Sequence, residues 1–204
     1  MLLQNICLAD NNVSTAGCKD PNSGFYKTTA GEKSEKIYGL VQCRGDVSAA
    51  NCANCTNKSV AVALQDCLKS KTVKVWFTWC YLRDSDQPFF SVWDKSTYKV
   101  PTHDDPSVGS QGFNFLNGLA AATLMLQARV LNVGQSGKGY GMVQCTRDIS
   151  RANCSKCFDA QLMTFRTIVG NSRGWEIYGY SCSMWYHDNQ FYFSTMTISS
   201  ISVP

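Results

Sequence analysis

The sequence YGLVQCRGDVSAANCANC, at residues 38–55, recurs as YGMVQCTRDISRANCSKC at residues 140–157. Eleven of the eighteen positions are identical without a gap, and the cysteines of both copies are spaced C-x8-C-x2-C. A fourth cysteine follows in the same register, Cys80 in the first copy and Cys182 in the second, 102 residues apart. This self-similarity indicates a duplicated domain of about 100 residues.

The chain has 204 residues, of which eleven are cysteines. Domains this small bury modest cores and are often reinforced by disulfides, which persist in oxidising compartments. Zinc is the alternative, because Cys52 and Cys55 are spaced like a ligand pair, but the two histidines, His103 and His187, do not repeat. We therefore expect disulfides, no metal and no cofactor. The net charge of +4 is too small to favour a nucleic-acid partner.

Several features predict a secreted, extracellular protein. No apolar run approaches the roughly 18 residues that a membrane span requires, so no span is expected. No charged and apolar leader precedes Cys7, and we expect Met1 to begin a mature chain. Of four Asn-X-Ser/Thr sequons, those at Asn12 and Asn57 are the candidate glycosylation sites, because in those at Asn54 and Asn153 the middle residue is a cysteine.

Each repeat is predicted to run strand, turn, helix, strand, strand. Ile37–Cys43 is a strand, Ser48 caps the helix that follows, and the second copy's helix shows three- and four-residue apolar spacing up to Ile168. Val73–Arg83 and Trp175–Tyr186 are rich in β-branched and aromatic residues and are predicted as strands.

Strict alternation along Val73–Arg83 makes both of its faces apolar. One face would carry Val75, Phe77, Trp79 and Tyr81, and the other Trp76, Cys80 and Leu82. In Trp175–Tyr186, alternation would place Trp175, Ile177 and Trp185 opposite Tyr178, Tyr180, Cys182 and Met184. An antiparallel sheet covered on one side usually shows water a polar second face. Two alternatives follow: the second faces of the two domains cover each other, or exposed aromatic residues form a platform for carbohydrate.

The predicted organisation is a first domain at residues 1–98, a linker at 99–111 and a second domain at 112–204. The linker prediction is based on Pro101–Gln111, which has two prolines, one glycine and no apolar periodicity. Phe113–Arg129 is predicted as an amphipathic helix that opens the second domain. Between Cys7 and Gly24 there is no comparable segment, so the first domain is expected to lack this helix.

With the two cysteine motifs, their YGLVQC and YGMVQC lead-ins and the segment CYLRDSDQPFF at residues 80–90, the chain resembles plant tandem stress-antifungal proteins. Their ginkbilobin-homologous domain occurs in cysteine-rich repeat secretory proteins, in ectodomains of cysteine-rich receptor-like kinases and in plasmodesmata-located proteins. The resemblance covers residues 2–95 and 108–198. It implies an α+β fold of two tandem disulfide-stapled domains, each with helices packed on an antiparallel sheet of about five strands.

The resemblance also implies the disulfide pairing, in which the family's cysteines pair first with fifth, second with third and fourth with sixth. Carried over, this gives Cys43–Cys52, Cys55–Cys80, Cys145–Cys154 and Cys157–Cys182. Cys67 would pair with an N-terminal cysteine, for which Cys7 fits best because Leu2–Cys7 reads as a short strand. Cys18 is then the unpaired candidate. The second domain lacks both members of this pair, since Val169 stands at the position of Cys67.

Binding is favoured over catalysis. Neither histidine lies in a recognisable nucleophile–base motif, and Asp104 and Asp105 fall in the predicted linker, so no enzyme is expected. Some single-domain relatives bind mannose through three polar residues, whose positions are held by Leu8, Lys74 and Ser85 in the first domain. The last two of these positions are held by Glu176 and His187 in the second domain. Lys74, Ser85 and the neighbouring Asp84 are the candidate carbohydrate-binding residues, with a solvated strand edge as the alternative for Lys74 and Asp84.

The favoured hypothesis is a secreted binding protein of the plant apoplast that acts in defence or stress signalling. It would recognise a cell-wall or fungal carbohydrate, or a pathogen protein, through a surface other than the inherited mannose site. The alternative is a protein–protein interaction module that docks on a receptor or forms a homodimer without binding carbohydrate. A free Cys18 would favour this alternative, because it could link two copies.

Overall fold

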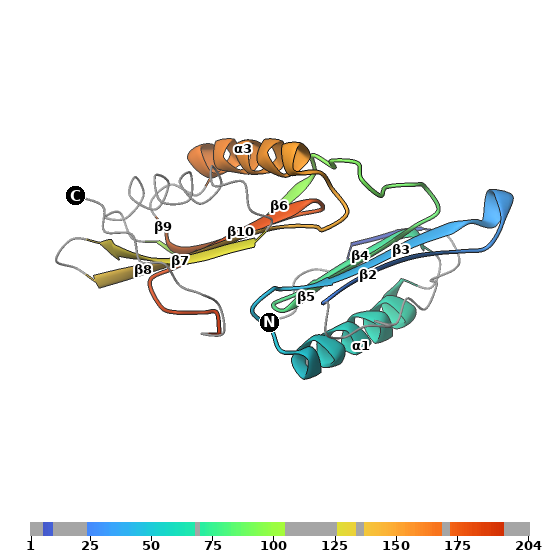
Figure 1. Cartoon of the computed structure of the whole chain (residues 1–204), viewed down its shortest axis with the longest axis horizontal. Helices are drawn as coiled ribbons and strands as arrows, with labels where there is room; N and C mark the ends of the chain where they lie inside the picture. Colours follow the sequence, from blue (N-terminus) through green and yellow to red (C-terminus); the bar gives the residue numbers. More distant parts are fainter. Residues whose placement is uncertain are drawn as a thin grey trace. The chain divides into compact units, whose positions relative to one another are not determined.

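The computed structural model describes residues 6–9, 24–67, 70–104, 126–133, 137–168 and 172–193. The chain divides into two compact units, Met1–Phe90 and Ser91–Pro204. In each unit a long helix lies across one face of a five-stranded antiparallel sheet (Figure 1). This confirms the α+β class that the resemblance implies and the duplicated domain that the repeat predicts.

The first unit contains β1 (Ile6–Ala9), β2 (Phe25–Ala30), β3 (Ile37–Cys43), α1 (Ala49–Asp66), β4 (Ser70–Phe77) and β5 (Cys80–Ser85). Its strand order is β1-β4-β5-β3-β2, so β4 and β5 are interior strands. A short 3₁₀ turn, η1 (Lys33–Glu35), joins β2 to β3.

The second unit repeats this topology. It contains β6 (Thr97–Asp104), β7 (Leu126–Val133), β8 (Gly137–Cys145), α3 (Arg151–Ile168), β9 (Ser172–Gly179) and β10 (Cys182–His187). The strand order β6-β9-β10-β8-β7 matches that of the first sheet position by position. Because α3, β9 and β10 begin and end 102 residues after α1, β4 and β5, residues of the two units can be compared directly.

The first long helix starts at its predicted cap, Ser48, and the second starts at the equivalent residue, Ser150. Ser48 Oγ accepts a hydrogen bond from the Asn51 backbone N–H at 3.3 Å, and Ser150 Oγ accepts one from Asn153 at 3.2 Å. Such a cap satisfies a donor that the first helical turn leaves unpaired. One face of α1 is buried, with Cys52, Cys55, Ser59 and Ala63 at three- and four-residue steps. This face packs on the sheet and carries the helix's cysteines to it.

The prediction of one continuous strand over Val73–Arg83 was wrong, because the segment is a hairpin. Phe77 pairs with Cys80 across the two-residue turn Thr78-Trp79. The alternation restarts at the turn, so Phe77 and Cys80 lie on the same face of the sheet. That helix-facing side carries Val73, Val75, Phe77, Cys80 and Leu82, whereas Trp76 and Tyr81 stack on the opposite face with ring centroids 5.1 Å apart.

The same correction applies to Trp175–Tyr186. Its two strands, β9 and β10, pair Ile177 with Met184 and Trp175 with Tyr186. These four side chains therefore share the face that builds the core of the second unit. Trp185 lies opposite Glu176 and points to the other face together with Tyr178, and their rings meet edge-on at 5.8 Å.

The expected domain boundary at residue 98 and part of the expected linker are also corrected. The second unit begins at Ser91, and Thr97–Asp104 forms β6, which pairs with β9. Pro101 suggested a linker, but β6 is an edge strand, and its register shifts between Pro101 and His103. Edge strands and bulges are the places where a sheet tolerates proline.

Other predictions fall partly or wholly outside the described residues. Leu126–Arg129, the expected end of the amphipathic helix, belongs to strand β7, and residues 113–125 lie outside the described part. Residues 105–111 of the expected linker and residues 10–23, which include Asn12 and Cys18, lie outside it as well.

Candidate binding groove in the first unit

Disulfides join each helix to its sheet. The bonded pairs are Cys43–Cys52, Cys55–Cys80, Cys145–Cys154 and Cys157–Cys182, which are the pairs that the resemblance implies. Cys67 is disulfide-bonded too. The backbone of Cys7 lies in β1 opposite Val73, but its side chain is outside the described part, so the Cys7–Cys67 bond remains a prediction.

The structure does not bring the three candidate carbohydrate-binding residues together. Lys74 and Ser85 lie on the sheet face opposite α1, where Ser85 Oγ is 3.0 Å from Thr72 Oγ1. Asp84 pairs with Val73 and therefore points to the helix-facing side. All three side chains are buried and belong to interior strands, so the solvated strand edge proposed for Lys74 and Asp84 is wrong as well.

Asp84 is a buried carboxyl group rather than a ligand acceptor. It is 3% exposed, and neither of its carboxylate oxygens has a hydrogen-bond partner in the described structure. Burial disfavours the charged form and raises the pKa of Asp84 from its ordinary value of 3.8 to about 7. This group is therefore set up to titrate between acidic and neutral pH.

In the second unit, the corresponding polar residues bind one another. Glu176 Oε2 accepts a hydrogen bond from the Tyr178 hydroxyl at 2.6 Å, and Glu176 Oε1 lies 3.2 Å from His187 Nε2. Both oxygens of this carboxylate thus already have partners within their own sheet.

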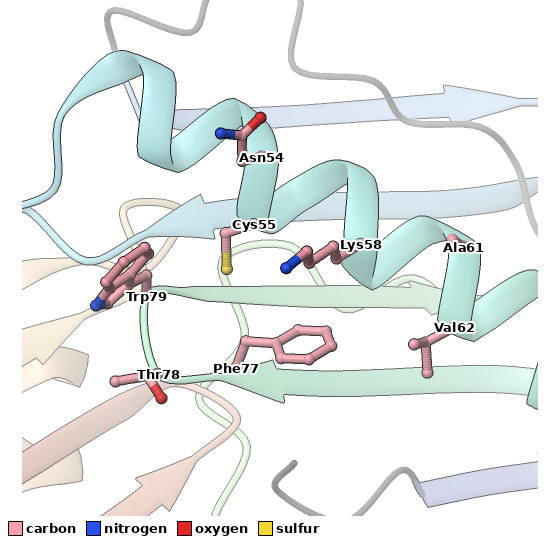
Figure 2. A pocket seen from close by; sticks show the side chains of 8 residues that line it. All are labelled: Asn54, Cys55, Lys58, Ala61, Val62, Phe77, Thr78 and Trp79. Carbon is pink, nitrogen blue, oxygen red and sulfur yellow. The ribbon is translucent and has the colours of Figure 1, made fainter. Parts of the chain in front are cut away.

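A groove between α1 and the β4–β5 hairpin of the first unit combines aromatic and polar side chains. Its volume is about 620 Å³. Figure 2 shows helix residues along one wall and the hairpin along the other. The lining residues are Asn54, Cys55, Lys58, Ala61, Val62, Phe77, Thr78 and Trp79. Ligand sites typically have this size and this mixture of apolar surface with a few polar groups.

The turn that carries Trp79 is held from the end of β3. The Arg44 backbone N–H donates to the Trp79 carbonyl at 2.8 Å, and Arg44 Nη1 donates to the Thr78 carbonyl at 3.4 Å. Asp46 fixes the Arg44 guanidinium, and both side chains are buried. Trp79 and Phe77 also pack against the disulfide cluster of Cys43, Cys52, Cys55 and Cys80. The groove therefore has a rigid base.

The second unit fills the corresponding region differently. Positions 58, 77 and 79 correspond to Ala160, Gly179 and Ser181. Gln161 is fully buried and donates from Nε2 to the Cys182 carbonyl at 2.6 Å. A Cβ atom at Gly179 would lie 2.7 Å from that nitrogen, so a large residue on the helix accompanies a glycine on the strand. In the first unit the helix carries the small Ser59 and the strand carries Phe77.

The hairpin turn of the second unit is also covered by its own chain. The Asp94 N–H donates to Ser181 Oγ at 2.9 Å, the Tyr180 N–H donates to the Ser96 carbonyl at 3.4 Å, and Trp93 packs against the core. The aromatic groove is thus a feature of the first unit. Our sequence reasoning missed it, although a register comparison of Phe77 and Trp79 with Gly179 and Ser181 would have shown the difference.

Within the described ranges, no three or more histidine, cysteine or acidic side chains are grouped to hold a metal ion. None of the helices there has the length and apolar character needed to cross a membrane. Asn57 is exposed on α1, whereas Ser59 of the same sequon is fully buried; glycosylation at Asn57 remains a prediction.

Comparison with known proteins agrees with this architecture. The chain is 28% identical to cysteine-rich repeat secretory protein 55 of Arabidopsis thaliana, over 90% of this chain and 75% of the relative. It is 29% identical to an antimicrobial ginkbilobin-2-like protein of Castanea crenata, over 82% of this chain and 73% of the relative.

Among solved structures, the tandem DUF26 ectodomain of the Arabidopsis thaliana cysteine-rich receptor-like protein PDLP8 has a similar fold. The TM-score is 0.77 at 20% identity, over 93% of this chain and 99% of that one. The profile of one protein family, described as salt stress response/antifungal, matches twice, at residues 2–87 and 112–189. With both units matched, the chain belongs to the salt stress response/antifungal family.

Proposed function

We propose that this chain is a secreted binding protein of the plant apoplast that acts in defence or stress responses. We further propose that it recognises a cell-wall or fungal carbohydrate in the groove between α1 and the β4–β5 hairpin. Two similar proteins are named as a secretory protein and as an antimicrobial protein, which supports the location and the role. Disulfide-stapled domains of this size also suit an oxidising, extracellular compartment.

The observation that carries the proposal is the half-buried indole of Trp79 beside exposed polar groups. The side chains of Asn54, Lys58 and Thr78 are exposed, and all three line the groove with Trp79. A sugar presents an apolar ring face together with hydroxyl groups. An aromatic side chain can pack against the apolar ring face, and amide, amine and hydroxyl groups can form hydrogen bonds with the sugar hydroxyls.

A glycan array probed with the intact chain tests the proposal. We expect binding to at least one class of plant or fungal wall glycan, and at least a tenfold loss for Trp79→Ser, which installs the residue of the second unit. Val92→Ser, which removes an exposed apolar side chain of the second unit, is the matched control and should bind normally. If the chain binds no glycan on the array, or if Trp79→Ser binds as well as the parent chain, the carbohydrate proposal is contradicted.

The second candidate function is a protein–protein interaction module that docks on a receptor or on a second copy. The similarity to the ectodomain of a receptor-like protein favours it. An odd number of cysteines, eleven, also leaves at least one without a partner inside the chain. Non-reducing gels and light scattering of the chain and of Cys18→Ser test the covalent dimer. A dimer that disappears in Cys18→Ser would support it, and a monomeric parent chain would exclude it.

A further inference from the structure

The groove of the first unit carries a positive charge. Among the described residues that line it, Lys58 alone is charged. In Figure 2 its amine reaches from α1 into the space above Phe77, with Trp79 farther along the same groove. No carboxylate of the described residues pairs with this amine. A cation beside apolar walls attracts an anionic group more strongly than the same cation in open solvent.

The other lining groups favour a hydroxyl-rich ring over a peptide. Asn54 and Thr78 offer a side-chain amide and a hydroxyl, and Trp79 offers an aromatic face. The wall formed by Asn54–Val62 is helical, so its backbone donors and acceptors are used within α1. Peptide recognition by main-chain hydrogen bonds is thus not available on that wall. A neutral sugar would leave the Lys58 amine hydrogen-bonded to water, whereas an anionic sugar would supply a charged acceptor.

We propose that this groove binds a carboxylated sugar, a uronic acid unit of an anionic polysaccharide. The inference rests on the proposed function and deepens it by naming the ligand class. The sugar ring lies against Trp79 and its carboxylate accepts a charge-assisted hydrogen bond from Lys58 Nζ, with Asn54 and Thr78 at the rim of the groove for neighbouring sugar units (Figure 2). The second unit has Ala160, Gly179 and Ser181 at the positions of Lys58, Phe77 and Trp79, so it does not repeat this set of side chains.

Calorimetric titration of the intact chain with a linear oligogalacturonide tests this, with the same oligomer after reduction of its carboxyl groups as the comparison. We expect one site per chain and about tenfold tighter binding of the carboxylated form, as one charged hydrogen bond provides. Lys58→Ala should remove this preference, and Lys58→Arg should retain it. Lys156→Ala removes a lysine from an exposed position of the second helix and should change nothing.

The remaining outcomes separate the inference from the proposed function. If both oligomers bind equally, or Lys58→Ala keeps the preference, the uronic acid assignment is overturned while carbohydrate binding stands. If poly-glutamate competes for the site as well as unlabelled oligogalacturonide does, the site recognises negative charge alone and the uronic acid assignment also fails. If no glycan binds on the array or in the calorimeter, the proposed function fails with it. Lys58 is exposed on α1, so its variants should fold.

Discussion

Arg44 and Asp46 form a buried, two-pronged ion pair at the base of the turn that carries Trp79. Arg44 Nε lies 2.7 Å from Asp46 Oδ1, and Arg44 Nη2 lies 2.9 Å from Asp46 Oδ2. Both residues are at most 5% exposed. In the second unit Thr146 replaces the arginine, and its hydroxyl donates to the Ser181 carbonyl at 3.3 Å. The first unit therefore holds its hairpin turn with a charge pair where the second uses a hydroxyl.

Neutralising Asp46 should destabilise the first unit strongly. Asp46→Asn leaves the Arg44 guanidinium buried without its counter-ion, and removing one partner of a buried pair costs roughly 3–5 kcal/mol. Urea unfolding should show this loss in the free energy of unfolding. Asp159→Asn, at an exposed carboxylate of the second helix, is the control and should stay within about 0.5 kcal/mol. Equal stability of the two variants would show that the ion pair contributes little.

The stability of the first unit should fall as the pH rises from about 4 to about 7. The pKa of Asp84 is raised in the folded state to about 7 from 3.8, so in this window the native chain binds more protons than the unfolded one. Stability then decreases with pH. Across the whole window the free energy of unfolding should fall by roughly 4 kcal/mol, because each unit of the pKa difference between the folded and unfolded states corresponds to about 1.4 kcal/mol.

Urea unfolding at several pH values, for the parent chain and Asp84→Asn, isolates this effect. The variant cannot ionise at position 84, so its stability should fall less across the window, and it should be the more stable protein at pH 7.5. Identical pH profiles for the two proteins would mean that the Asp84 carboxyl does not titrate in this range.

Within each unit, the disulfide that closes the longer loop should contribute more stability. Cys55–Cys80 spans 25 residues and Cys43–Cys52 spans 9. Loop-closure entropy assigns them roughly 3.5 and 2.5 kcal/mol. In variants in which both cysteines of one disulfide are replaced by alanine, urea unfolding should show the larger stability loss for Cys55–Cys80. The second unit offers a replicate, since Cys157–Cys182 and Cys145–Cys154 have the same separations. A reversed order in both units would rule out the entropic account.

Gly179→Ala should destabilise the second unit by about 1–3 kcal/mol through crowding. The added Cβ would lie 2.5 Å from the Cys182 carbonyl oxygen and 2.7 Å from Gln161 Nε2. Adding Gln161→Ser, the residue of the first unit, removes one of these contacts, so the double variant should lose less stability than the two single variants combined. Ser183→Ala on the adjacent strand is the control. If the stability losses of the two single variants simply add in the double variant, the side chains at positions 161 and 179 do not compete for the same space.

The sequence predicted the elements that local signals mark. The repeat placed Ile37–Cys43 as a strand, and Ser48 marked the start of the helix. The hairpin was missed because Thr78-Trp79 contains none of the Gly, Asn or Asp residues that usually mark a two-residue turn. That error placed Phe77 and Cys80 on opposite faces.

The candidate site was harder to predict, because it depends on packing between distant residues. Asp84 follows a run of strand residues, and nothing local shows that its carboxyl lies on the side of the sheet that α1 covers. The groove depends on whether the strand or the helix supplies the large side chain between them. In the first unit this side chain is Phe77 of β4, and in the second it is Gln161 of α3. Such an exchange becomes visible only when helix and strand are placed together.

The most direct test of the account is a two-dimensional NMR titration of the isotope-labelled chain with oligogalacturonide. We expect the largest chemical-shift changes at the amides of residues 54–62 and 77–79 and at the Trp79 indole N–H, and no change at residues 156–164 and 179–181 of the second unit. Changes centred on the second unit, or no changes at saturating oligomer, would contradict the account.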